Sequence, residues 1–85
     1  MTEDKLNELM AITAEECAEL THECMKVFRF GLEQNNRDRL LKEAGDVMAM
    51  IEIMIENDIL TKEEINARIF VKKEKLKIWS NLYEP

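Results

Sequence analysis

The sequence has few of the residues that interrupt helices. Its 85 residues include two glycines and a single proline, and that proline is the last residue. Proline and glycine are the residues least tolerated inside helices, so long uninterrupted helices are expected. A chain of this length forms one domain at most and is close to the lower limit for a self-sufficient core. We expect a single all-α domain over residues 1–85 that forms a homo-oligomer, a dimer or a tetramer.

Cysteine is scarce as well. Cys17 and Cys24 are seven positions apart on one expected helix. At a rise of about 1.5 Å per residue, their Cα atoms lie about 10 Å apart, too far for a disulfide within the helix. The chain has one histidine and no C-x-x-C motif, so a structural zinc site is not expected. Both thiols are expected to be buried as small apolar side chains.

The chain also lacks an excess of positive charge and any long apolar run. Twelve basic residues against eighteen acidic ones give a formal net charge of −6. Nucleic-acid-binding proteins and membrane-surface helices usually carry a basic face, so neither a nucleic acid nor a membrane is an expected partner. No apolar run approaches the roughly 20 residues that span a bilayer, and MTEDKLNELM does not read as a signal peptide. The expected location is the cytoplasm.

Apolar residues, by contrast, recur at helical spacing. The pattern predicts three main antiparallel helices in an oligomeric bundle, at about Glu3 to Phe30, from Asn36 or Arg37 to Glu56, and from Lys62 to about Asn81. Gly31 is expected to end the first helix, and Thr61 to begin the third in a capping box with Glu64. Spacings of four and three give the first helix a seam for packing, formed by Leu6, Met10, Thr13, Cys17, Leu20, Cys24 and Val27.

Acidic residues border the seams of the first two helices. Residues three apart are neighbours on a helix surface, so Glu16 pairs with Glu19, and Glu43 with Asp46. If these helices pack antiparallel, four carboxylates face one gap, where they repel one another and lose water. A divalent cation removes that repulsion, and oxygen ligands select a hard ion, Mg²⁺ or Mn²⁺. The plainer interpretation is that each acid is a solvated surface charge.

The two acidic stretches also resemble a known signature. EECAE at 15–19, followed by EAGD at 43–46, resembles the E-E-x-x-E … E-x-x-D signature of the MazG-like, all-α nucleoside triphosphate pyrophosphohydrolases. The stretches EECAELTHECMKVFRFG and LLKEAGDVMAMIEIMIE resemble the two central helices of small, stand-alone members, including those carried by phages. The resemblance covers about residues 5–80. It implies a Mg²⁺-dependent hydrolase that converts a nucleoside triphosphate to the monophosphate and pyrophosphate by attack of water at the α-phosphorus.

The resemblance implies roles for individual acids. Glu16, Glu19, Glu43 and Asp46 would be the Mg²⁺ ligands, with Mn²⁺ as a substitute. The catalytic group would be Glu15, Glu16 and Glu19, in which Glu15 binds a second ion or orients the attacking water.

Basic residues should complete such a site. A late helix of MazG proteins carries a pattern like N-x-K-x-x-x-R, and NARIFVK at 66–72 places Arg68 and Lys72 at those offsets with the two basic types exchanged. These two residues would bind the β- and γ-phosphates, with Lys73 and Lys75 as substitutes. Lys72 equally fits a side chain that extends to solvent from the edge of a seam.

The nucleotide-binding residues are less determined. Candidates are His22, Phe28, Phe30 and Trp79, each of which also fits simple packing. Ile53 stands where longer MazG proteins commonly carry an asparagine, so sugar and base contacts are expected to differ. Two alternatives stay open. One is a substrate-restricted dCTP/dUTP-type or phosphoribosyl-ATP-type pyrophosphatase of the same fold. The other is a non-catalytic helical dimerisation module with solvated carboxylates and no metal dependence.

Overall fold

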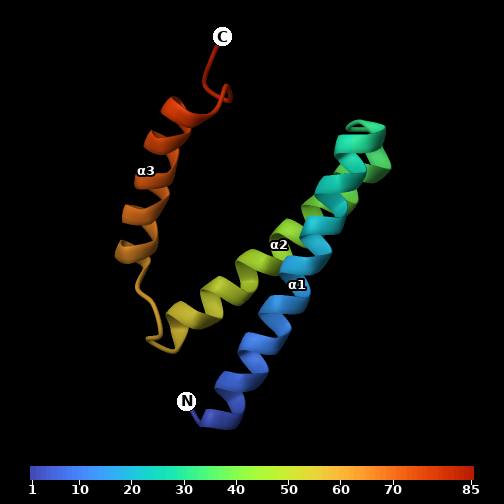
Figure 1. The fold of residues 1–85 in the computed structure, drawn as a ribbon. Helices are drawn as coiled ribbons and strands as arrows, with labels where there is room; N and C mark the ends of the chain where they lie inside the picture. Colours follow the sequence, from blue (N-terminus) through green and yellow to red (C-terminus); the bar gives the residue numbers. More distant parts are fainter. The chain divides into compact units, whose positions relative to one another are not determined.

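The chain is entirely helical. The computed structural model describes all 85 residues and contains no strand (Figure 1). Its helices are α1 (Glu3–Phe30), α2 (Gln34–Glu56) and α3 (Lys62–Trp79). This confirms the all-α class and the three predicted helices; α2 begins two residues before the earlier of its two predicted starts, and α3 ends two residues before its predicted end. None of the three combines enough length with enough apolar character to cross a bilayer.

Both ends of α1 follow from local chemistry. Thr2 is the N-cap, and its hydroxyl oxygen accepts a hydrogen bond from the Lys5 N–H at 3.2 Å. At the other end Gly31 has φ +84° and ψ 175°, a conformation that is essentially restricted to glycine. The Gly31 N–H donates to the Val27 carbonyl at 2.8 Å, which satisfies one carbonyl of the last turn. The prediction that Gly31 ends the helix is confirmed.

The predicted capping box of α3 is also present. The Glu64 N–H donates to the Thr61 hydroxyl oxygen at 3.1 Å, and the Thr61 N–H donates to the Glu64 carboxylate at 3.0 Å. The helix ends at Trp79 because Ser80 adopts an extended conformation. The Ser80 N–H still donates to the Leu76 carbonyl, at 3.0 Å.

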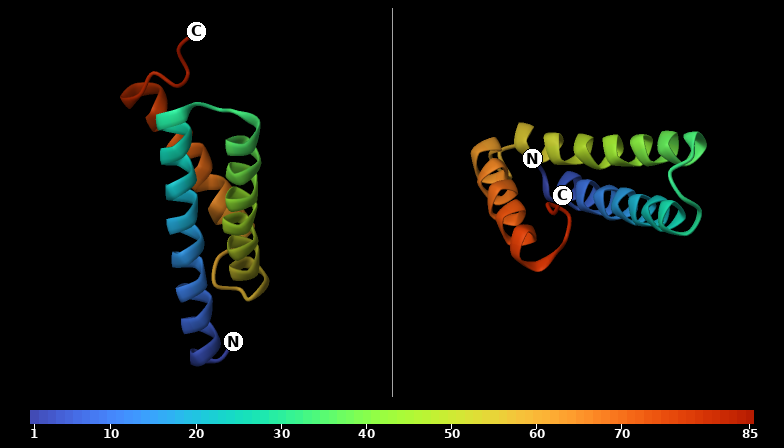
Figure 2. Two further views of the ribbon diagram at one scale, coloured as in Figure 1. Left: turned by 90° about the vertical axis from the view of Figure 1, so that its right-hand side faces the viewer. Right: turned by 90° about the horizontal axis from the view of Figure 1, so that it is seen from above.

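The chain divides into two compact units, Met1–Met54 and Ile55–Pro85. In the first unit, α1 and α2 run antiparallel and side by side as a helical hairpin (Figure 2). The Asn36 side-chain amide donates to the Gly31 carbonyl at 3.0 Å and so fastens the short connection between the helices. The second unit contains the last residues of α2 and all of α3, and no α3 residue is buried.

The face of α1 that the hairpin buries differs from the predicted seam. Leu9 and Glu23 are buried, Glu16 between them is half-buried, and Cys17 and Cys24 are exposed. The prediction that both thiols are buried is therefore wrong for the single chain. The physical reason is that α1 turns positions 9, 16 and 23 toward α2, so the apolar residues at 6, 10, 17 and 24 lie beside the contact.

The buried residues of α2 repeat at the same interval. Asn36, Glu43 and Met50 are its three buried residues, seven positions apart. Seven-residue spacing keeps side chains on one face of a helix, as in two-stranded helical packing. The predicted stripe of α2 lies around them and is half-buried: Leu40, Ala44, Val47, Ile51 and Met54. The hairpin thus has an apolar contact at its open end, where Leu9 and Met50 are buried, and acids where a core is normally apolar.

Candidate metal and phosphate site

Three acids meet across the middle of the hairpin. Glu16 and Glu19 come from α1 and Glu43 from α2, and each contributes a carboxylate oxygen to a group whose atoms all lie within 4.8 Å of one another. The antiparallel packing therefore brings together three of the four predicted metal ligands. The fourth, Asp46, lies one turn after Glu43, and its negative charge acts on the Glu16 carboxyl. We call these four residues the acid cluster.

Two oxygens of the acid cluster are buried without a partner. Oε2 of Glu16 and Oε2 of Glu43 have no hydrogen-bond partner and are inaccessible to solvent. Glu43 as a whole is only 8% exposed. Burying a carboxylate oxygen that has no hydrogen bond or counter-ion costs free energy, because the oxygen loses its hydration and gains no new interaction. Such oxygens fit a hard divalent cation, which prefers carboxylate ligands.

The electrostatics of the cluster point in the same direction. Partial burial raises the pKa of Glu16 above its usual 4.5, and the negative charges of Asp46 and Glu43 raise it further. The pKa of Glu19 is raised first by the neighbouring Glu43 carboxyl, with which a protonated Glu19 could share its proton, and then by the charges of Glu43 and Glu16. The surrounding acids thus make Glu16 and Glu19 harder to ionise, so these two carboxyls favour a bound proton or a nearby cation.

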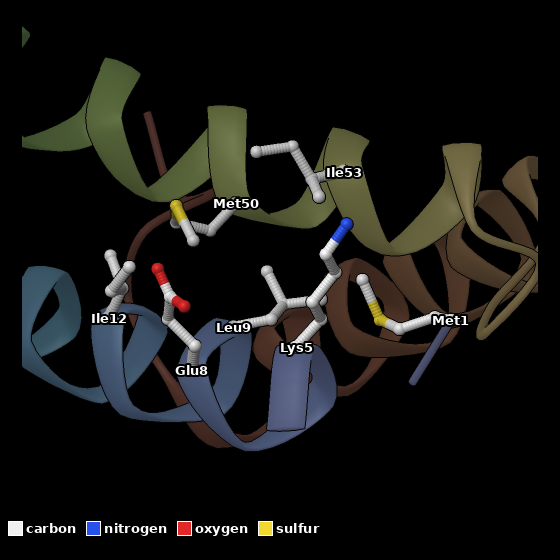
Figure 3. Close-up of a pocket in the computed structure, with 7 residues that line it drawn as sticks. All are labelled: Met1, Lys5, Glu8, Leu9, Ile12, Met50 and Ile53. Carbon is white, nitrogen blue, oxygen red and sulfur yellow. The ribbon is translucent and has the colours of Figure 1, made fainter. Parts of the chain in front are cut away.

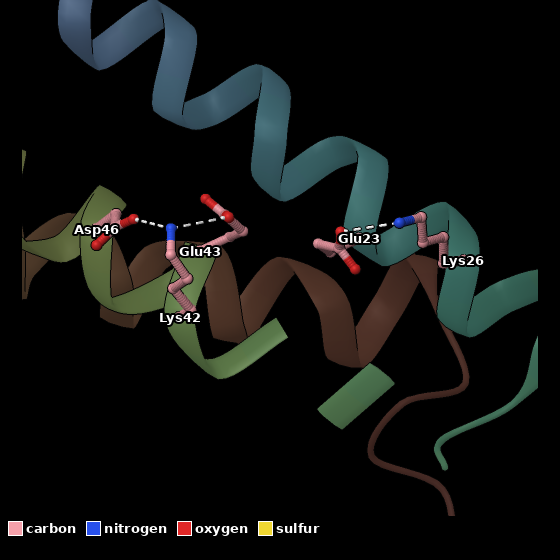
Figure 4. Close-up of polar contacts among 5 residues, drawn as sticks. All are labelled: Glu23, Lys26, Lys42, Glu43 and Asp46. Atoms are coloured by element: carbon pink, nitrogen blue, oxygen red, sulfur yellow. Dashed lines mark hydrogen bonds and ion pairs between the residues drawn. The ribbon is translucent and has the colours of Figure 1, made fainter. Parts of the chain in front are cut away.

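One basic side chain already contacts the cluster. Lys42 Nζ lies 3.1 Å from Asp46 Oδ2 and 3.3 Å from Glu43 Oε1 (Figure 4). Its hydrogen bonds with Asp46 and Glu43 raise the Lys42 pKa, and its charge lowers the pKa of Glu16 and of Glu19. Sequence reasoning assigned no role to Lys42. The available signal was its position directly before Glu43 and four residues before Asp46, a spacing that favours an ion pair on a helix.

Glu23 is a second residue that sequence reasoning missed. It is 7% exposed, and its Oε1 lies 3.3 Å from Lys26 Nζ while its Oε2 is buried without a partner (Figure 4). It follows Glu19 by four residues and Glu16 by seven, so it continues the acidic face of α1 toward the connection. That spacing was visible in the sequence. Its burial depended on how α1 is rotated against α2.

An apolar pocket lies on the side of the acid cluster opposite to Glu23, toward the open end of the hairpin, where Leu9 and Met50 are buried. Its volume is about 250 Å³, and its lining is Met1, Lys5, Glu8, Leu9, Ile12, Met50 and Ile53 (Figure 3). Ile12 precedes Glu16 by one helical turn, and Met50 follows Asp46 by one turn. The pocket therefore lies directly beside the acid cluster, between α1 and α2. Lys5 and Glu8 are the charged residues of its lining.

The remaining predicted residues lie elsewhere. Glu15 is exposed on α1 and is not part of the group of three close carboxylates. His22, Phe28 and Phe30 are exposed on α1 and do not line the pocket. On α3, in the second unit, the exposed residues are Arg68, Lys72 and Trp79. Arg68 and Lys72 are four residues apart and share a face of the helix.

No protein-family model matches the chain, and neither a curated protein nor a solved structure matches it. The function is therefore inferred from the acid cluster, from its neighbours in the hairpin and from the motif in the sequence.

Proposed function

We propose that the chain is a Mg²⁺-dependent nucleoside triphosphate pyrophosphohydrolase, similar to the MazG-like enzymes. The observation that carries the proposal is the pair of buried, unpartnered oxygens of Glu16 and Glu43 within a group of three close carboxylates. On a merely solvated acidic face most carboxylate oxygens stay accessible to water, and buried polar atoms without a partner are uncommon. The residues of the acid cluster are also those at the metal-ligand positions of the E-E-x-x-E … E-x-x-D signature.

The donor set fits a hard ion. Glu16, Glu19, Glu43 and Asp46 offer only oxygens, and the negative charges around Glu16 and Glu19 raise the pKa of these two acids. These four side chains would hold Mg²⁺, or Mn²⁺ in its place. When bound, the ion neutralises charge on the phosphate oxygens and on the leaving pyrophosphate.

Other residues would handle water and phosphate. Glu15 would orient the attacking water and accept its proton as the water oxygen bonds to the α-phosphorus. The bond between the α-phosphorus and the oxygen that bridges to the β-phosphorus breaks, which releases pyrophosphate and leaves the monophosphate. Arg68 and Lys72 would bind the β- and γ-phosphates through charge-assisted hydrogen bonds.

The nucleoside would extend along the groove from the acid cluster. The apolar pocket begins one helical turn from the cluster and can receive an apolar face of a base or a sugar. His22, Phe30 and Trp79, the aromatic candidates from the sequence, would contact the nucleotide where another copy of the chain brings them to the site. Ile53, in the pocket lining, offers no polar group to a base or a sugar.

The chain would act as a homo-oligomer, a dimer or a tetramer, in the cytoplasm. Leu9 and Met50 are its only buried apolar residues, and large apolar side chains lie open on each helix. In α1 and α2 these are Leu6, Met10, Met25, Phe28, Phe30, Leu41 and Met48. Exposed apolar surface of this extent is typical of a protein whose helices are covered by a partner.

A substrate panel tests the proposal. Purified protein is incubated with each common and modified (d)NTP and Mg²⁺, and the monophosphate and pyrophosphate are separated by chromatography. We expect equimolar release of both products from at least one nucleotide, abolished by chelation with EDTA and by Glu16→Gln. Glu52→Gln is the matched control, because Glu52 is exposed on α2 outside the cluster. No release from any nucleotide, together with no stabilisation by Mg²⁺ or Mn²⁺, would overturn the proposal.

The same panel separates the alternatives. Turnover of one nucleotide only would indicate the substrate-restricted form, of the dCTP/dUTP or the phosphoribosyl-ATP type. The exposed apolar side chains of all three helices favour the other alternative, a non-catalytic dimerisation module. A stable oligomer that neither turns over a nucleotide nor responds to a divalent cation would establish that module instead.

A further inference from the structure

Lys42 is the cation that the acid cluster holds in this structure. Its ammonium group contacts one oxygen of Glu43 and one of Asp46, at 3.3 and 3.1 Å. These two acids are also proposed metal ligands, so Lys42 and a divalent ion would use the same carboxylates. The proposed metal site therefore has a competitor on its own helix.

The ammonium group is an incomplete substitute for a divalent ion. Lys42 contacts Oε1 of Glu43, whereas Oε2 of the same carboxylate is buried and unpartnered, as is Oε2 of Glu16. The Lys42 side chain is also 67% exposed. Ion pairs of an exposed lysine are weak, because water screens them and the flexible side chain loses entropy when it is held. A divalent ion would displace Lys42 easily if it binds both the oxygens that Lys42 contacts and the buried oxygens that have no partner.

Displacement leaves the lysine charged and close to the site. Its backbone stays on α2, directly before Glu43, and its flexible four-carbon stem lets the ammonium group turn away from the carboxylates. A triphosphate that the bound ion attracts would bring new phosphate oxygens close to the ammonium group. A lysine ammonium serves phosphate oxygens well as a compact point charge.

We infer that Lys42 is a phosphate-binding residue of this site, held by Glu43 and Asp46 in the metal-free protein and released to the triphosphate when a divalent cation takes these two carboxylates. The inference rests on the proposed metal site. It assigns opposite effects to one side chain: Lys42 weakens the binding of metal alone and strengthens the binding of a triphosphate together with metal.

Two titrations by calorimetry test these effects without turnover. Mn²⁺ alone is titrated into the protein, and then inorganic tripolyphosphate at saturating free Mg²⁺. For Lys42→Met we expect Mn²⁺ to bind about two- to tenfold more tightly, from the loss of two exposed pairs. We expect tripolyphosphate to bind about tenfold more weakly or worse, from the loss of a charge-assisted contact. Lys42→Arg should keep the wild-type affinity for tripolyphosphate within a few-fold, because it keeps the charge.

Lys26→Met is the matched control. Lys26 also pairs with a buried acid of the hairpin, Glu23, but contacts no member of the acid cluster. We expect both of its affinities to stay within about twofold of the wild-type values, which excludes a general effect of lost positive charge. Circular dichroism checks that each variant is as helical as the parent chain.

The outcomes separate this inference from the proposed function. If Lys42→Met binds Mn²⁺ no more tightly than the wild type, or binds tripolyphosphate equally well, the inference is wrong even where nucleotides are hydrolysed. If both affinities change in the expected directions but no nucleotide is hydrolysed, the inference stands and the enzyme proposal fails. A wild-type chain that binds neither Mn²⁺ nor tripolyphosphate overturns both.

Discussion

Glu16 of α1 and Glu43 of α2 lie within one group of carboxylate oxygens less than 4.8 Å apart, and each has one oxygen that is buried and without a hydrogen-bond partner. They occupy equivalent places in the hairpin, since Leu9, Glu16 and Glu23 repeat every seven residues on α1. The buried residues of α2, Asn36, Glu43 and Met50, repeat at the same interval of seven. The middle of the hairpin contact is thus acidic, at positions where helix pairs usually bury apolar side chains.

Removing one charge from this contact should stabilise the metal-free protein. We expect Glu16→Gln to raise the Tm measured in EDTA, because the amide removes repulsion with Asp46 and Glu43. The same variant should lose the rise in Tm that Mg²⁺ or Mn²⁺ gives the wild type. Its nucleotide turnover should be abolished, because losing even an outer partner of a metal ligand typically lowers activity about 10–100-fold.

The control for this experiment is Glu52→Gln, on an exposed position of α2. Scanning calorimetry with and without the ion should give wild-type behaviour for this variant. A Glu16→Gln protein that is less stable in EDTA than the wild type, or that still responds fully to Mg²⁺, would show that Glu16 is not a repelled metal ligand.

The contribution of Glu16 and Glu19 to stability should fall as the pH rises above about 4.5 in the absence of metal. The pKa values of Glu16 and Glu19 are raised in the folded chain, so the folded state binds more protons than the unfolded state just above their ordinary values. Their contribution to stability is fully present below the unfolded pKa and is lost as the pH passes the raised pKa of the folded state. Urea unfolding in EDTA between pH 4 and 7 measures this loss.

The other carboxylates titrate in the same range, so the informative quantity is a difference between variants. Glu16→Gln should show a shallower fall in unfolding free energy over this interval than the wild type. Saturating Mg²⁺ should reduce the fall in the wild type as well. Parallel curves for the wild type and the variant would mean that Glu16 is not under repulsion in the folded chain.

The two glycines should respond to alanine in opposite directions. Gly31 has φ +84° and ψ 175°, where a side chain costs about 1–3 kcal/mol, so Gly31→Ala should destabilise the chain by about that amount. Gly45 lies inside α2, and a Cβ there would meet nothing within 4 Å. Gly45→Ala should therefore stabilise by about 0.5–1 kcal/mol. Urea unfolding at one fixed protein concentration compares the two.

Because a Cβ at Gly31 also meets nothing within 4 Å, a loss there reports backbone strain alone. Equal stability of Gly31→Ala and the wild type would contradict the positive φ at the end of α1. A destabilised Gly45→Ala would mean that something outside the single chain, such as a second copy, packs against that position.

The cysteines should report whether a second copy covers α1. Cys17 and Cys24 are exposed in the single chain, on the apolar seam beside the hairpin contact. If oligomers form through this seam, the rate of thiol modification by a disulfide reagent should fall as protein concentration rises. Light scattering follows the mass in parallel, and Cys17→Ser isolates the Cys24 signal. An increase in mass without thiol protection would place the interface on another face.

The ends of α1 and the start of α3 were predictable because they depend on neighbours in the sequence. Thr61 and Glu64 satisfy each other's backbone groups across one turn, and Gly31 supplies a conformation that other residues avoid. The start of α2 was misplaced by at least two residues. No side-chain cap marks it, and its first turn begins with ordinary helical bonds such as Arg37 N–H to the Glu33 carbonyl at 2.8 Å.

The acidic spacing was also readable in the sequence. Glu16, Glu19 and Glu43 were expected to share one gap if the two helices pack antiparallel, and the hairpin brings these three together. The buried face of α1 could not be found in the same way. A search for apolar periodicity selects Met10, Cys17 and Cys24, whereas the positions turned toward α2 include Glu16 and Glu23, which such a search passes over.

The sequence by itself determined the helices, their caps and the acidic positions, because these depend on residues within a few places of one another. Only the tertiary structure decided which oxygens of Glu16, Glu23 and Glu43 are buried, and that two cysteines remain exposed. Both follow from the rotation of α1 about its axis against α2. That rotation is set by the sum of contacts between residues far apart in the sequence, and no local pattern encodes it.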